Sequence, residues 1–202
     1  MPALAITAPE DPATATPTTA FSLEALPDPS HPKNGVGRAK NDGNFVVTGL
    51  TLSAKLPDGT IQTIALSDAR ADHAQNGYPV LHAIQNPGPT NKHGWAVSGG
   101  GTLLQDAHRA VFQIAKPTAY PAGTELVLRI EQNFDFGTPG FSIGRLRIAE
   151  TTTKDVFRAS DLPGNLWMAA RAKKPNRDHL RTWAAARSGP AAKALQAEVA
   201  AL

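Results

Sequence analysis

The sequence predicts an all-β domain, an antiparallel β-sandwich, with a short helical C-terminal extension. Between residues 44 and 150, short apolar or alternating runs are separated by turns rich in Gly, Pro, Asn and Asp. Beyond residue 150, apolar residues recur at helical spacing. We therefore expect an extended leader over residues 1–20, a sandwich over 21–152 and a helical extension over 153–202.

The leader is rich in proline, alanine and threonine. Seven of the 17 prolines lie within the first 32 residues. Because proline has no N–H group and disrupts helices, residues 3–19 are expected to be an extended leader or an edge segment.

Seven runs in the central region are expected to be strands: residues 45–54, 61–66, 78–84, 94–97, 107–114, 125–132 and 142–150. In the sixth run Leu126, Leu128 and Ile130 alternate with Val127, Arg129 and Glu131, which is typical of a strand with one face in the core. Strands in this number, with no helices between them, predict two antiparallel sheets packed face to face.

The C-terminal extension has helix start signals and apolar stripes. Asp161 precedes a proline at a predicted helix start, and Asn176 is a plausible N-cap for a helix that carries Leu180 and Trp183 on one stripe. Short helices are marginal alone in water. We therefore expect Trp183 to be buried against the sandwich or against a second copy of the chain.

A glycine- and asparagine-rich block, GVGRAKNDGNFVVT, covers residues 35–48 and follows LEALPDPS at residues 23–30. Such a loop turns sharply and then enters a sheet. The block resembles the β-rich domain of the large planctomycete proteins that carry a cytochrome c domain. This resemblance implies a module of a larger exported protein, placed between the haem domain and downstream regions of unknown function.

A second resemblance concerns the fold. The segments ADHAQNGY at residues 71–78, AIQN at 83–86 and GWA at 94–96 resemble the pattern of galactose-binding-like jelly rolls of the discoidin type. The resemblance implies a galactose-binding-like jelly roll. We also expect Trp95 to belong to the core. Gln85 and Asn86 stand where that family usually has Asp-Gly. Because a neutral amide brings no charge to a hard cation, a structural calcium would need carboxylates such as Asp72 or Asp68. We expect no metal and no cofactor.

Composition excludes several classes of function. The chain has no cysteine, which excludes disulfides, thiolate metal sites and covalent haem attachment. No apolar run is long enough to predict a membrane span. The first residues lack the features of a secretory signal, so the chain as given is either cytoplasmic or a fragment of an exported protein. The resemblance favours a periplasmic or extracellular parent protein.

Charge is divided unevenly along the chain. Residues 1–150 hold 11 Lys and Arg against 13 Asp and Glu, whereas residues 151–202 hold 9 against 4. A nucleic-acid-binding domain would be expected to carry a dense basic stripe interleaved with aromatic residues. The central region has none, so nucleic acid is not an expected partner.

The sequence does not predict an enzyme. The six histidines show no His-x-x-x-His or His-Glu-x-x-His spacing. Glu125, Glu131, Asp135 and Glu150 are spread along late strands and turns, where carboxylates are usually solvated.

The predicted ligand-binding residues are Tyr78, Phe134, Phe136, Phe141, Arg145 and Arg147. Three of them are aromatic residues within one loop, at 134–141, which is either an exposed platform or a plug for one end of the sandwich. Arg145 and Arg147 share a strand face and either hold an acidic sugar substituent or pair with acids on a neighbouring strand, such as Glu131 or Asp135.

These observations predict a non-catalytic carbohydrate-binding module with a polysaccharide as its partner. Aromatic rings stack on the apolar faces of sugars while polar groups orient the hydroxyls. The alternative is a structural or docking module that joins a cytochrome c domain to downstream domains and binds no small ligand.

Overall fold

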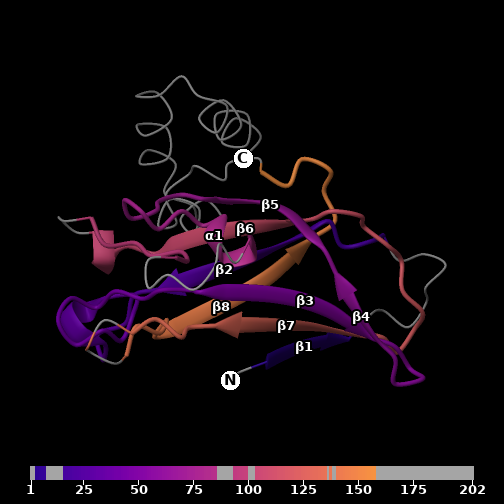
Figure 1. The fold of residues 1–202 in the computed structure, drawn as a ribbon, viewed down its shortest axis with the longest axis horizontal. Coiled ribbons are helices and arrows are strands. Elements are labelled where there is room, and N and C mark those ends of the chain that lie inside the picture. Colours follow the sequence, from indigo (N-terminus) through magenta and orange to yellow (C-terminus); the bar gives the residue numbers. More distant parts are fainter. Residues whose placement is uncertain are drawn as a thin grey trace, which may run out of the picture.

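The predicted antiparallel β-sandwich is confirmed (Figure 1). The computed structural model describes residues 3–7, 16–85, 93–99, 103–135, 137 and 140–157. Within these residues, eight strands form two four-stranded sheets, and all strand pairs are antiparallel. Residues 158–202 of the expected helical extension, including Trp183, lie outside the described residues, as does Phe136.

The two sheets have the orders β1-β7-β3-β4 and β5-β6-β2-β8. The strands are β1 (Ala3–Thr7), β2 (Ala20–Leu26), β3 (Gly49–Lys55), β4 (Ile61–Ile64), β5 (Leu66–Ala71), β6 (His108–Ile114), β7 (Glu125–Glu131) and β8 (Arg145–Thr151). The short helical elements are η1 (Pro32–Asn34), α1 (His82–Gln85) and η2 (Leu103–Gln105). None of the helices in the described ranges is long and apolar enough to cross a membrane.

Alternation along the strands places the core between the sheets. Leu126, Leu128 and Ile130 of β7 are buried, as the pattern predicts. Trp95 is fully buried and packs edge-on against Phe45, with ring centroids 5.0 Å apart. The expected core position of this tryptophan is confirmed.

Strand β2 is the main element missing from the strands predicted by sequence. It lies between β6 and β8 and is buried along almost its whole length. Its sequence, AFSLEAL, lacks a clean alternation and contains a glutamate. The pattern is blurred because both faces are covered, so β2 does not show the polar face of an ordinary sandwich strand.

Two of the predicted strands are wrong. Residues 78–84 contain a turn and the start of α1. Val80 just before α1 and Ala83 within it are buried three residues apart. Residues 94–97 contribute only an isolated bridge between Trp95 and Val47. The run 61–66 also divides: Ile64 ends β4 in one sheet and Leu66 begins β5 in the other.

The block at residues 35–48 is a tight loop that ends in the core. Gly37 forms a bridge with Ile143, and its N–H donates to the carbonyl of Gly43 at 2.7 Å. The buried Asn44 side chain donates to Gln75 Oε1 at 3.0 Å and accepts from the N–H of Val97 at 3.2 Å. The glycines permit close backbone approach, and the asparagine joins this block to two distant segments.

A smaller apolar cluster lies on the other face of the second sheet. Ala20 and Val111 are buried there with Val156, and Phe157 packs against them. The guanidinium of Arg70 lies 4.5 Å from the centroid of the Phe157 ring. Val156 and Phe157, which follow β8, therefore pack on the outside of the sandwich.

Candidate functional site

Three of the predicted ligand-binding residues come together as an aromatic cluster. The ring of Phe134 contacts Tyr78 edge-to-face, with centroids 5.9 Å apart, and contacts Phe141 in the same way at 4.9 Å. All three side chains are partly exposed. Edge-to-face pairs of this kind contribute about 1 kcal/mol beyond burial, so the cluster holds Phe134 in a defined orientation. The cluster is therefore both a packed end of the sandwich and a partly accessible aromatic surface.

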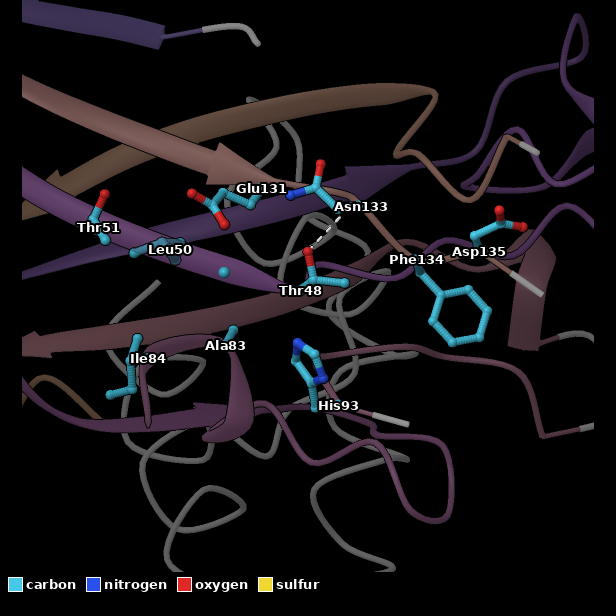
Figure 2. A pocket seen from close by; sticks show the side chains of 11 residues that line it. Thr48, Leu50, Thr51, Ala83, Ile84, His93, Glu131, Asn133, Phe134 and Asp135 are labelled. Atoms are coloured by element: carbon cyan, nitrogen blue, oxygen red, sulfur yellow. Dashed lines mark hydrogen bonds between the residues drawn. The ribbon is translucent and has the colours of Figure 1, made fainter. Parts of the chain in front are cut away.

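Phe134 also lines a pocket of about 490 Å³ (Figure 2). The pocket lies between the start of β3, the end of β7, α1 and the segment that holds His93. Its lining residues are Thr48, Gly49, Leu50 and Thr51, Ala83 and Ile84, His93, and Glu131, Asn133, Phe134 and Asp135.

Hydrogen bonds hold the segment after β7 beside the start of β3. The N–H of Thr48 donates to the carbonyl of Glu131 at 2.8 Å. The hydroxyl of Thr48 accepts from the N–H of Asn133 at 3.1 Å. These two bonds place Asn133 and Phe134 at the wall of the pocket, while Thr51 continues the wall along β3 (Figure 2).

Gly49 gives the Glu131 side chain room beside β3. The two residues are opposite each other across β3 and β7. A Cβ atom on residue 49 would lie 3.0 Å from Glu131 Oε2 and 3.3 Å from its Cβ and Cδ, which is tighter than an ordinary contact. A glycine at this position lets the carboxylate lie close to the backbone at the pocket.

The pocket carries two acidic side chains. Glu131 forms an ion pair with Arg129 at 3.1 Å, and Asp135 Oδ1 accepts from the N–H of Gly137 at 2.9 Å. Arg129 is not among the lining residues. Carboxylates, an amide and hydroxyl groups beside an aromatic ring can accept and donate hydrogen bonds to a polyhydroxylated ligand.

The two predicted arginines do not line this pocket. Arg147 Nε donates to Glu24 Oε2 at 2.6 Å, and Arg145 lies 3.7 Å from Asp28 Oδ2. Pairing with acids is the structural alternative that the sequence left open, but the expected partners are wrong. The actual partners are Glu24 on β2 and Asp28 just after it, and β2 is the strand that pairs with β8. The expected partners were wrong because β2 was not recognised as a strand from the sequence.

Sequence analysis missed most of the polar wall of the pocket. Glu131 and Asp135 were weighed only as scattered carboxylates, and Thr48, Thr51, Asn133 and His93 were not weighed as ligand contacts. The one local signal is the run EQNFDF at residues 131–136, where polar side chains flank aromatic residues at the end of a strand.

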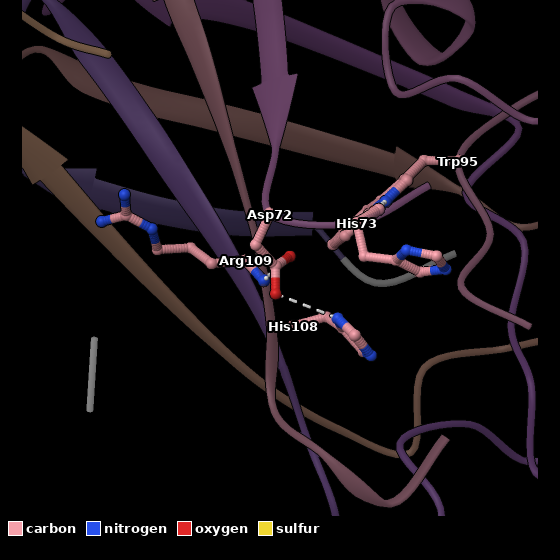
Figure 3. A network of polar contacts seen from close by, with 5 residues as sticks. All are labelled: Asp72, His73, Trp95, His108 and Arg109. Carbon is pink, nitrogen blue, oxygen red and sulfur yellow. Dashed lines mark hydrogen bonds and ion pairs between the residues drawn. The ribbon is translucent and has the colours of Figure 1, made fainter. Parts of the chain in front are cut away.

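A second polar cluster is buried away from the pocket (Figure 3). His108 and Asp72 have side chains only 3% and 2% exposed, and His108 Nδ1 lies 3.0 Å from Asp72 Oδ2. The indole N–H of Trp95 donates to the carbonyl of His73 at 2.9 Å. Burial, followed by the nearby His108 ring, lowers the pKa of His73 below its usual value. Because the Asp72 and His108 side chains are almost fully buried, we interpret the role of this cluster as structural.

The carboxylates suggested for calcium have other partners. Asp72 Oδ1 accepts from the N–H of Arg109 at 2.9 Å, and its other oxygen faces His108. Asp68 accepts from the N–H of Ala69 at 2.8 Å and lies 3.7 Å from Arg70. The residues placed by the structure include no group of three or more His, Asp or Glu arranged to hold a metal ion.

The molecule is thus a β-sandwich with a polar pocket and an aromatic cluster. No family model, no curated protein and no solved structure matches the chain.

Proposed function

We propose that this chain is a non-catalytic carbohydrate-binding module of a larger exported protein of the planctomycete cytochrome c domain-containing type. The observation that carries the proposal is the position of Phe134, which lines the pocket while its ring is held by Tyr78 and Phe141. A ring held in this way stacks on a sugar with little loss of side-chain entropy.

The polar wall supports the same function. Asn133, Asp135 and Thr51 are exposed and line the pocket together with Phe134. Short polar side chains of this kind form hydrogen bonds to sugar hydroxyls with little conformational cost. A pocket of about 490 Å³ is large enough for a small ligand or for one or two residues of a chain.

Blocking the pocket tests the proposal directly. Thr51 and Thr63 are both exposed, on neighbouring strands of one sheet, and only Thr51 lines the pocket. We expect Thr51→Trp to abolish the retardation of the protein by polysaccharides in affinity electrophoresis. Thr63→Trp is the matched control and should bind like the wild type.

A second variant tests the aromatic contact. Phe134→Ala should weaken binding about threefold to tenfold, the value of one aromatic contact. Thermal melting of each variant separates loss of the ligand contact from loss of the fold.

If Thr51→Trp folds and binds undiminished, the site is wrong. If a broad polysaccharide panel fails to retard the wild-type chain, the carbohydrate function is wrong.

The second candidate function is a docking module that joins neighbouring domains of a parent protein. The cluster of Ala20, Val111, Val156 and Phe157 favours it, because it fixes the start of the C-terminal segment on the sandwich surface. A docking module without a ligand predicts that Thr51→Trp and Thr63→Trp behave alike in every binding assay.

A further inference from the structure

The pocket combines an aromatic ring with carboxylates, and this combination is suited to a cation. We infer that its ligand is a glycan that carries protonated amines, so the pocket prefers amino sugars to neutral sugars and disfavours uronic acids. This inference rests on the proposed carbohydrate-binding function. It names the class of sugar that the same pocket selects.

The two carboxylates lie at separate points of the pocket wall. Glu131 ends β7 and lies opposite Gly49, and Asp135 follows four residues later, after Phe134. Both line the pocket, whereas Arg129, the partner of Glu131, does not. A ligand amine would therefore face a carboxylate at two points of the wall. Arg129 would offset only part of the combined negative charge of these two groups.

The titratable side chains lining the pocket are Glu131, Asp135 and His93. The Glu131 side chain is 31% exposed, so it is partly shielded from water and its charge is less screened than that of a solvated group. The two carboxyl groups outnumber the single histidine in this lining. A uronic acid would bring a third negative charge to this wall.

Phe134 adds an independent attraction for a cation. The face of a phenyl ring carries partial negative charge and attracts ammonium groups. Phe134 and Asp135 line the same pocket, so an amine bound there shares the pocket with an aromatic surface. The same ring stacks on the apolar face of the sugar.

The guanidinium groups that would suit an acidic sugar are engaged elsewhere. Arg147 is bound to Glu24, and Arg145 lies beside Asp28. Neither residue lines the pocket. The charge of the pocket wall therefore comes from its carboxylates.

Calorimetric titration of the full chain with three hexasaccharides tests the inference. The probes are a glucosamine hexamer, its N-acetylated counterpart and a galacturonic acid hexamer, at about pH 6 and low salt. We expect the glucosamine hexamer to bind about fivefold more tightly than the N-acetylated hexamer, the value of one or two partly exposed ion pairs. The galacturonic acid hexamer should bind most weakly.

Charge-neutral variants locate the effect. Asp135→Asn and Glu131→Gln keep an oxygen acceptor for Gly137 and Arg129, and each should reduce the preference to about twofold. Glu125→Gln is the matched control. Glu125 is on β7 like Glu131 and pairs with Lys55, but it does not line the pocket. This variant should keep the full preference.

The outcomes separate the two proposals. Equal binding of the glucosamine and N-acetylated hexamers, or tighter binding of the galacturonic acid hexamer, would overturn the amino-sugar inference and leave carbohydrate binding standing. A preference that survives in both Asp135→Asn and Glu131→Gln would also overturn it. Failure of all three hexamers and of the wider polysaccharide panel would overturn the proposed function itself. Binding of polylysine without any hexamer would show that the pocket takes cationic peptides instead.

Discussion

Asp72 accepts hydrogen bonds from two neighbours that are consecutive in the chain. Its Oδ2 lies 3.0 Å from Nδ1 of His108, and its Oδ1 lies 2.9 Å from the backbone nitrogen of Arg109 (Figure 3). A His108 tautomer with its proton on Nδ1 fits this geometry, since carboxylate oxygens accept hydrogen bonds. The pair joins the end of β5 to the start of β6 inside the protein.

Removal of this carboxylate should destabilise the fold strongly. Asp72→Ala would remove a buried carboxylate that contacts the His108 ring and the Arg109 N–H, at a cost of about 2–4 kcal/mol. Urea unfolding measures the loss. Glu125→Ala, which breaks an exposed pair with Lys55, should change stability by about 0.5 kcal/mol or less. Equal losses in the two variants would contradict the structural role of Asp72.

The two arginines of β8 should differ in their contribution to stability. Arg147 binds Glu24, whose side chain is only 6% exposed, whereas Arg145 is 64% exposed and lies 3.7 Å from Asp28. Arg147→Ala leaves a buried charge without its partner, and we expect a loss of about 1–3 kcal/mol. Arg145→Ala should cost about 0.5 kcal/mol or less. Chemical unfolding of the two variants measures this difference in the free energy of unfolding. A larger loss of stability for Arg145→Ala than for Arg147→Ala would refute the prediction.

His73 should make stability depend on pH. Burial is the first cause of its lowered pKa, and the nearby His108 is the second. Below the ordinary histidine pKa of 6.5, the unfolded chain binds a proton that the folded chain resists. Its contribution to stability is therefore complete above about pH 6.5 and decreases as the pH falls toward the lowered value.

The comparison that isolates this effect uses His73→Gln. Urea unfolding of the wild type and the variant at about pH 7.5 and pH 5.5 should show a smaller loss on acidification in the variant, because the shifted group has been removed. An identical pH dependence in the two proteins would contradict the assignment to His73.

Gly37 should tolerate no side chain. A Cβ atom at this position would overlap the backbone carbonyl of Asn44, which cannot move like a flexible side chain. We expect Gly37→Ala to give little soluble folded protein. Gly77→Ala is the control, since its Cβ has open space and only the φ of +82° opposes it, at a cost of about 1 kcal/mol. Similar melting temperatures for the two variants would show that the loop adapts.

The local sequence pattern was sufficient to predict strands that have one exposed face. In β7, Leu126, Leu128 and Ile130 recur at every second position, so residues 125–132 could be recognised from spacing alone. Strand β2 could not be recognised in this way. Its buried Glu24 is compatible with a central strand only because Arg147, distant in the sequence, is directly opposite on β8.

The candidate site also combines residues that local sequence identifies with residues that only strand pairing brings together. The sequence identified Phe134 and Phe141 because they lie in one aromatic loop, and it added Tyr78 from a distant segment. It could not identify Thr48 or Thr51 as neighbours of Phe134, because they approach the loop only when β3 pairs with β7.

Composition and local pattern were enough to predict the class of fold, the absence of cysteine chemistry and the aromatic character of one loop. These properties depend on composition and on periodicities of a few residues. Only the tertiary structure decided which acids the arginines meet, where the pocket lies and which charges line it. Those features arise from pairing between segments far apart in the chain, and no local spacing records which strand becomes the neighbour of another.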